Sequence, residues 1–238
     1  YNRSTQQLFL IFIETYNYIS NALRYLIDKK IVHFDIKQEN ILYSTKYENP
    51  FLIDFGISIP IKQITNNNLK QYFYIYAPDY DIWPLEIHVI NYILHIGTLT
   101  SASIQTIIDA YLDNYIFDNF SDIFKKKYII AANNYYSQFL KMNNTDIINK
   151  LLKYYYTWDL YSLSIMYIKF LKKLFKKGFI YNQFLIAFSK LIIENISPIP
   201  ENRNNIDINN IKYNNIFYLN QSSKNYNILI NELNANKF

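Results

Sequence analysis

The feature that most constrains the fold is a run of apolar residues at helical spacing near the start of the chain. Between positions 8 and 27 they recur every three or four residues, at Leu8, Ile11, Phe12, Tyr16, Ile19, Leu23 and Leu26. This spacing places them on one face of an α-helix, and that face has to pack against other apolar surface. The chain therefore begins with an amphipathic helix that needs further elements to cover it.

Most of the remaining chain is also expected to be helical. Apolar periodicity predicts helices at 85–95, 157–175 and 184–193, and a mostly helical region at 99–156. Asparagine pairs at Asn133-Asn134 and Asn143-Asn144 are expected to interrupt that last region.

Only a small sheet is expected after the first helix. Residues 40–43 and 50–53 read as two short strands joined by a polar turn. Residues 57–80 show no clean period and are predicted to form a long loop. The predicted fold class is therefore mainly α with a small β hairpin that presents polar residues at one edge.

Composition excludes several classes of protein. The chain has no cysteine, so neither a disulfide scaffold nor a cysteine-ligated zinc site is possible. No apolar run approaches the roughly 20 residues that span a bilayer. The net charge is +5, and the lysines are scattered except for clusters at 125–127 and 172–177. A solvated helix face explains those clusters better than a nucleic-acid groove. We therefore expect a soluble intracellular, cytoplasmic protein without a membrane or nucleic-acid partner.

Four polar residues around the predicted hairpin form a candidate phosphoryl-transfer site. Pairing of the two strands would bring Asn40 and Asp54 together, and two such oxygen ligands suit Mg²⁺, which takes its other ligands from phosphates and water. Asp35, in the loop before the first strand, could accept a proton from an attacking hydroxyl. Lys37 would place a cation near the transferred phosphoryl group.

These residues stand in recognisable motifs. The stretch HFDIKQENIL, residues 33–42, resembles the catalytic loop of eukaryotic-type Ser/Thr protein kinases, and Asp54-Phe55-Gly56 resembles their magnesium motif. The segment DLYSLS at 159–164 resembles the start of the kinase central helix, and PENR at 200–203 resembles a late segment of that domain. The order and spacing of the motifs make the resemblance specific.

The resemblance implies a role for each matching residue. Asp35 would be the catalytic base and Lys37 would neutralise the γ-phosphate, the lysine at this position being typical of Ser/Thr rather than Tyr kinases. Asn40 and Asp54 would hold Mg²⁺, and Leu42 would form the floor under the adenine ring. The expected function is ATP-dependent phosphoryl transfer to Ser or Thr of a protein substrate, with ATP and Mg²⁺ as cofactors.

Other matches imply structural roles. His33 and Phe55 would belong to an internal hydrophobic spine, and Asp159 would anchor the backbone of the catalytic loop. The arginine at 203 would pair with the acid that closes the activation segment. That acid is either Asp79 or Glu86, and Glu86 is preferred because it leads directly into an apolar helix.

All of these matches belong to the C-terminal lobe of a kinase. No Gly-rich loop and no nucleotide-binding strand lysine precede Asp35, so the N-terminal lobe is expected to lie upstream and to be absent from this chain. We expect a C-lobe fragment over residues 1–220, with a helical insertion at about 99–150 and a polar tail at 221–238. Alone, this fragment is expected to bind ATP poorly and to be inactive.

Phe34 is the main departure from the family pattern. It replaces the arginine that usually precedes the catalytic aspartate and reads a phosphate on the activation segment, which puts the usual phosphorylation switch in doubt. The alternative function is a pseudokinase or scaffold that uses the insertion for docking, although the four intact site residues argue against it. The biased composition is also similar to that of kinases from large DNA viruses or AT-rich protists.

Overall fold

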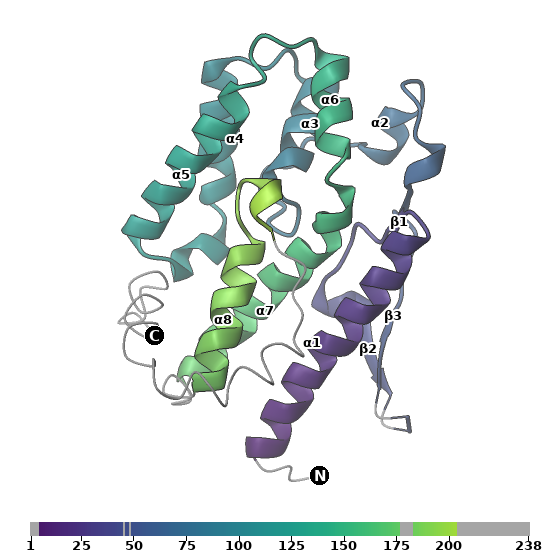
Figure 1. Ribbon diagram of the computed structural model, residues 1–238, viewed down its shortest axis with the longest axis vertical. Coiled ribbons are helices and arrows are strands. Elements are labelled where there is room, and N and C mark those ends of the chain that lie inside the picture. The colour runs from purple at the N-terminus through teal and green to yellow at the C-terminus, as the bar shows by residue number, and fades with distance from the viewer. Residues whose placement is uncertain (1–4, 45, 48, 177–182, 204–238) are drawn as a thin grey trace.

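The computed structural model describes residues 5–44, 46–47, 49–176 and 183–203. Its longer helices are α1 (Thr5–Asp28), α3 (Leu85–His95), α4 (Ser101–Leu112), α5 (Asp122–Ser137), α6 (Asn144–Leu152), α7 (Trp158–Lys176) and α8 (Gln183–Asn195). Helices dominate the fold and the strands are short (Figure 1). The expected fold class is therefore confirmed.

Two small antiparallel sheets follow α1. Strands β2 (Ile41–Ser44) and β3 (Asn49–Leu52) form the predicted hairpin, which lies beside α1 in Figure 1. Strands β1 (Ile31–Val32) and β4 (Ile59–Pro60) form the second sheet. This second sheet was not predicted, because two-residue strands are too short to show an alternating pattern.

The segment predicted as one long loop, 57–80, is more ordered than expected. It contains β4, a 3₁₀ turn at Ile61–Gln63 and the single-turn helix α2 (Leu69–Tyr72). These elements are held by tertiary contacts rather than by their own periodicity. Phe73, which directly follows α2, is completely buried.

Helix α7 lies at the centre of the core. Its residues Tyr161 and Leu163 are completely buried. Helices α1 and α8 pack against it, since the ring of Tyr167 on α7 lies 4.8 Å from that of Tyr16 on α1 and 6.0 Å from that of Phe188 on α8. Figure 1 shows α4, α5 and α6 at the opposite end of the molecule from the start of α1.

Capping side chains fix the starts of α4, α5 and α6. The hydroxyls of Thr100 and Ser121 and the side-chain oxygen of Asn143 accept backbone hydrogen bonds at the starts of α4, α5 and α6. The predicted break at Asn143-Asn144 is therefore confirmed. The predicted break at Asn133-Asn134 is wrong: α5 runs through both residues, and the side chain of Asn133 donates a 2.9 Å hydrogen bond to Gln105 on α4.

Membrane insertion finds no support in the part of the chain that the structure describes, where no helix combines the length and apolar character needed to cross a bilayer. The predicted tail at 221–238 lies outside the described residues.

Candidate active site

A buried carboxylate at the start of α7 holds the polar loop that precedes the hairpin. Asp159 accepts backbone hydrogen bonds from His33 at 2.7 Å and from Phe34 at 2.8 Å, one on each carboxylate oxygen. Hydrogen bonds to a charged acceptor are stronger than neutral ones. The expected anchoring role of Asp159 is therefore confirmed, and the loop has a fixed position on the core.

Phe34 fills an aromatic cluster next to this anchor. Its ring stacks on Trp83 at a centroid distance of 4.7 Å and meets the edge of Phe73 at 5.8 Å. The indole nitrogen of Trp83 also donates a 2.8 Å hydrogen bond to the carbonyl of Phe34. Phe34 is 1% exposed and has a φ of 70°, a strained value for a residue with a side chain. The cluster ties the loop to the segment before α3 without using a charge.

Asp35 follows directly and is surrounded by hydrogen-bond donors. Its oxygen Oδ2 accepts from Lys37 Nζ at 2.7 Å and from Asn40 Nδ2 at 2.8 Å. Its oxygen Oδ1 accepts from the hydroxyl of Tyr80. Burial by itself raises the pKa of the Asp35 carboxyl, but the hydrogen bonds from Lys37, Tyr80 and Asn40 outweigh it and lower the pKa. The carboxylate is therefore charged at neutral pH and fixed in orientation.

The hairpin brings Asn40 and Asp54 close to each other, as predicted. The backbone nitrogen of Ile53 donates to the carbonyl of Asn40 at 3.0 Å, so Asp54 stands one residue beyond the position opposite Asn40. Asp54 is exposed, with a φ of 62°, and its Oδ1 accepts a 3.2 Å hydrogen bond from the Gly56 nitrogen. A Cβ atom at position 56 would lie 3.1 Å from that oxygen, which is a tight contact.

This pair of residues fits a magnesium ion bound together with phosphates. The side-chain hydrogen bonds of Asn40 to Asp35 use its nitrogen Nδ2, so they do not occupy the acceptor oxygen Oδ1. Within the described ranges there is no group of three or more His, Cys, Asp or Glu residues that could hold a metal. A site with few protein ligands suits Mg²⁺, which keeps water and phosphate oxygens in its shell.

The hairpin also carries Leu42, the residue expected to lie under the adenine ring. Leu42 is 54% exposed, and it pairs with Phe51, which is 44% exposed. Residues directly opposite each other on antiparallel strands point to the same side, so the two form one exposed apolar surface. The rings of His33 and Phe55 lie 4.7 Å apart, but only His33 is completely buried, whereas Phe55 is 47% exposed.

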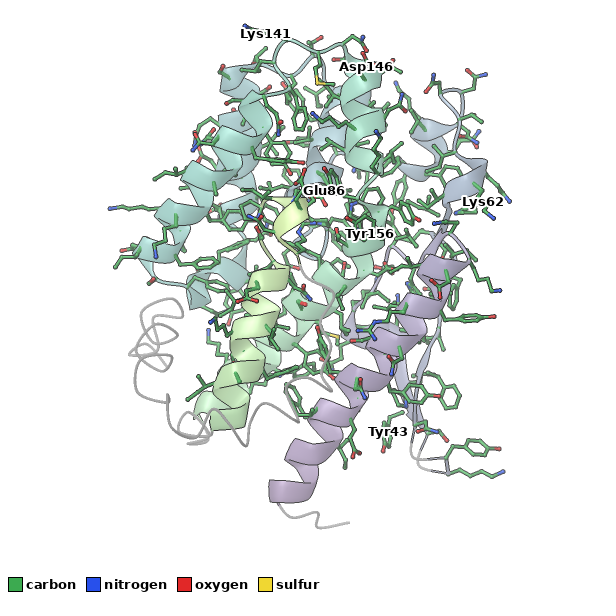
Figure 2. The ribbon with its side chains drawn as sticks, viewed as in Figure 1. Tyr43, Lys62, Glu86, Lys141, Asp146 and Tyr156 are labelled. Atoms are coloured by element: carbon green, nitrogen blue, oxygen red, sulfur yellow. The ribbon has the colours of Figure 1, made fainter. Side chains whose placement is uncertain are left out.

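The partner of Arg203 is Glu86. The two guanidinium nitrogens Nη1 and Nη2 lie 2.5 and 2.9 Å from the two carboxylate oxygens of Glu86. Glu86 lies inside the molecule, as Figure 2 shows, whereas Asp79 is exposed. The preference for Glu86 over Asp79 is therefore confirmed.

Tyr80 is the site residue that sequence reasoning missed. It lies in the segment predicted as a loop, and it is one of 25 tyrosines in the chain. No motif marks it. Only the folded path of 57–83 brings its hydroxyl to Asp35.

Comparison with known proteins agrees with this arrangement. The family profile described as "Protein kinase domain" matches residues 12–178, well over half of the chain. Neither the curated proteins nor the solved structures gave a significant match. The profile match includes the loop at 33–42, the hairpin and α7. The chain therefore belongs to the protein kinase domain family.

Proposed function

We propose that the protein transfers the γ-phosphoryl group of ATP to Ser or Thr hydroxyls of protein substrates. The observation that supports this best is the environment of Asp35. One oxygen of the Asp35 carboxylate accepts from the ammonium of Lys37 and from the amide of Asn40. The loop that carries Asp35 is anchored to the central helix α7. Phosphoryl transfer depends mainly on positioning and charge, and this arrangement supplies both.

Each residue has a defined part in the proposed reaction. Asp35 orients the substrate hydroxyl through Oδ1, the oxygen that neither Lys37 nor Asn40 occupies. Lys37, whose side chain is 37% exposed, keeps its ammonium beside this carboxylate and can also face a phosphate. Asn40 and Asp54 would hold Mg²⁺, and Leu42 would lie against the adenine ring. When bound, Mg²⁺ neutralises charge on the phosphates of ATP.

The test compares phosphate transfer by the full-length protein and by its Asp35→Asn variant. Radiolabelled ATP, Mg²⁺ and a mixture of dephosphorylated proteins are supplied, and the labelled amino acid is identified. We expect labelled Ser or Thr, and a loss of at least about 100-fold in Asp35→Asn, because the variant loses both the charge and the proton acceptor. Asp113→Asn, an exposed residue after α4, is the matched control and should keep the rate. Equal rates in wild type and Asp35→Asn would remove Asp35 from this role.

One observation favours the alternative of a catalytically silent scaffold. Tyr80 already donates to Asp35 Oδ1, the oxygen that a substrate hydroxyl would need. A scaffold would show no transfer in wild type and no gain of transfer when the Tyr80 hydroxyl is removed. An active kinase would show transfer in wild type, and removal of the Tyr80 hydroxyl would change its rate.

A further inference from the structure

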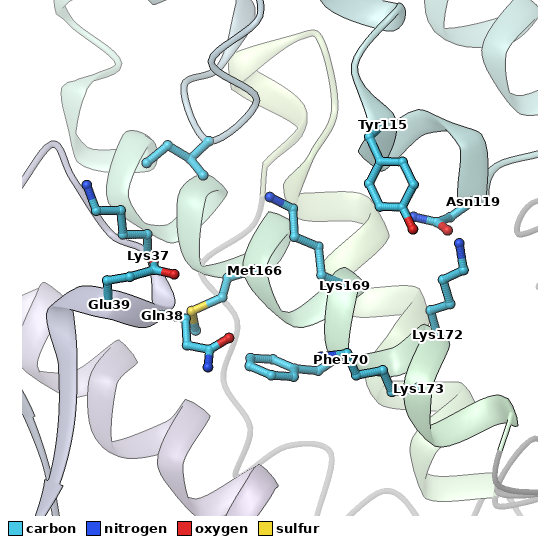
Figure 3. A pocket seen from close by; sticks show the side chains of 11 residues that line it. Lys37, Gln38, Glu39, Tyr115, Asn119, Met166, Lys169, Phe170, Lys172 and Lys173 are labelled. Atoms are coloured by element: carbon cyan, nitrogen blue, oxygen red, sulfur yellow. The ribbon is translucent and has the colours of Figure 1, made fainter.

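A pocket of about 410 Å³ opens directly beside the candidate site (Figure 3). Its walls come from the polar loop at 37–39, from the second half of α7 and from a 3₁₀ turn at Tyr115–Asn119. Lys37 belongs to both the pocket and the candidate site, since its ammonium lies 2.7 Å from Asp35 Oδ2. A polypeptide that presents a hydroxyl to Asp35 therefore has a neighbouring residue within reach of this pocket.

The lining is strongly basic. It includes Lys37, Lys169, Lys172 and Lys173, against one acid, Glu39. Two of these lysines are neutralised locally, Lys37 by Asp35 and Lys169 by Asp81 at 2.9 Å.

Lys172 and Lys173 have no acidic partner among the residues that the structure describes. Their ammonium groups instead lie over aromatic rings, 5.2 Å from the centroid of Tyr115 and 5.7 Å from that of Phe170. Ring faces attract cations only modestly and leave their charge available to an anion. Figure 3 shows the two side chains along one wall of the pocket, with Lys172 extending toward Tyr115 and Asn119.

The remaining lining suits the apolar part of a bound side chain, between its backbone and its charged end. Met166 and Phe170 supply apolar surface next to the ammonium groups. A concave surface with an excess of one charge sign and with apolar walls concentrates ligands of the opposite charge. An extended nucleic-acid backbone would instead need a row of cations along an open groove.

We propose that this pocket is a specificity subsite that binds an anionic side chain, a carboxylate or a phosphate, close to the acceptor hydroxyl of the protein substrate. This inference rests on the proposed function, because a substrate subsite requires that the protein phosphorylate a substrate. The peptide-binding test itself does not require phosphate transfer. Lys172 and Lys173 are the specificity-determining residues, and Lys169 stays paired with Asp81.

The test measures binding of fluorescent peptides to the full-length protein by anisotropy at physiological salt, where weak surface attraction is screened. The peptides share one serine acceptor and differ only in flanking residues, which are alanine, glutamate, phosphoserine or arginine. Glutamate and phosphoserine peptides are expected to bind about tenfold more tightly than the alanine peptide, as expected from a charge-assisted contact. The glutamate and phosphoserine arms distinguish a carboxylate subsite from one that needs a phosphate.

Charge reversal assigns the effect to the pocket. Lys172→Glu with Lys173→Glu should abolish the preference for anionic peptides and favour the arginine peptide. The matched control is Lys62→Glu with Lys141→Glu, because both lysines are exposed and lie away from the pocket (Figure 2). Equal affinity for all four peptides would overturn the proposal, and so would an equal loss of preference in the control variant.

The same experiments separate the two proposals. Anion preference that depends on Lys172 and Lys173, without phosphate transfer by the wild type, would keep the subsite and reject the kinase activity. Phosphate transfer without any anion preference would keep the activity and reject the subsite.

Discussion

Arg203 and Glu86 form a bidentate ion pair inside the protein, with nitrogen–oxygen distances of 2.5 and 2.9 Å. The pair joins the last described segment to the first turn of α3, although 117 positions separate the two residues. The guanidinium also lies 4.8 Å from the ring centroid of Tyr161 on α7. Three distant parts of the chain therefore meet at one buried charge pair.

Removing either partner of this pair should strongly destabilise the fold. Glu86→Gln or Arg203→Met is expected to lower the free energy of unfolding by about 3–5 kcal/mol, because the remaining charge stays buried without a partner. Urea denaturation measures the effect. The double variant Glu86→Gln, Arg203→Met should lose less than the sum of the two single variants, because it leaves no unpaired charge.

The surface pair of Lys125 and the exposed Asp118, 4.0 Å apart, provides the comparison. Asp118→Asn should change the unfolding midpoint little, because exposed ion pairs contribute little to stability. If Glu86→Gln is as mild as Asp118→Asn, the buried pair does not organise the fold as described.

Removing the Tyr80 hydroxyl should make the proposed enzyme faster. A substrate hydroxyl has to displace Tyr80 from Asp35 Oδ1, so Tyr80→Phe is expected to raise kcat/KM by about tenfold, the value of one hydrogen bond to a charged group. The same hydrogen bond lowers the pKa of Asp35, after the larger effects of burial and of Lys37. The acid limb of the pH–rate profile should therefore move to higher pH in Tyr80→Phe.

Tyr74→Phe is the control for this change, because Tyr74 is a nearby exposed tyrosine, 48% exposed, in the same segment. A fall in kcat for Tyr80→Phe with KM unchanged would show that Tyr80 positions Asp35 rather than blocking it.

The contrast between Asp35 and Tyr80 shows how far sequence could predict the candidate site. Asp35, Lys37 and Asn40 lie within six consecutive positions, so local order alone brings them together and a motif can reveal them. Tyr80 reaches Asp35 across 45 positions. Such a contact depends on the path of an aperiodic segment, which neither spacing nor composition specifies.

The fold shows the same contrast between features that local sequence specifies and contacts between distant positions. Helices such as α1 and α3 were predictable because their apolar residues repeat with the helical period. The β1–β4 pairing was not, because each strand has two residues and its partner is distant in sequence. The continuity of α5 through Asn133 was also missed, since a contact with α4 overrides the weak helix preference of asparagine there.

Shrinking Phe34 should destabilise the loop that carries Asp35. Phe34→Ala is expected to lower the free energy of unfolding by about 3–5 kcal/mol, because it removes the stacking on Trp83 and leaves a cavity in the aromatic cluster. Phe34→Leu should lose less, because it keeps most of the apolar volume. Urea denaturation of both variants tests this, and equal losses would show that packing volume does not determine the effect.

Acid should weaken the fold through His88, a buried residue of α3. Its Nε2 donates to the Trp83 carbonyl at 3.1 Å, while Nδ1 is buried and has no hydrogen-bond partner among the residues that the structure describes. Burial lowers the pKa of His88 to about 4 from its usual 6.5. Between those two pKa values the unfolded chain binds the proton and the folded protein does not, so stability falls as the pH decreases. The loss is on the order of 3 kcal/mol by pH 4.

The measurement is the free energy of unfolding at pH 7.5 and at pH 5, compared between wild type and His88→Gln. The variant should be less stable than wild type at pH 7.5 but should show a smaller loss on acidification, because glutamine does not titrate. His95→Gln is the control, since that histidine is exposed and its Nε2 donates to the Phe73 carbonyl at 2.7 Å. Carboxylates with a lowered pKa, such as Asp35, also weaken the fold in acid, but they titrate below pH 5. The comparison between pH 7.5 and pH 5 therefore does not include their effect. An unchanged pH dependence in His88→Gln would contradict the assignment.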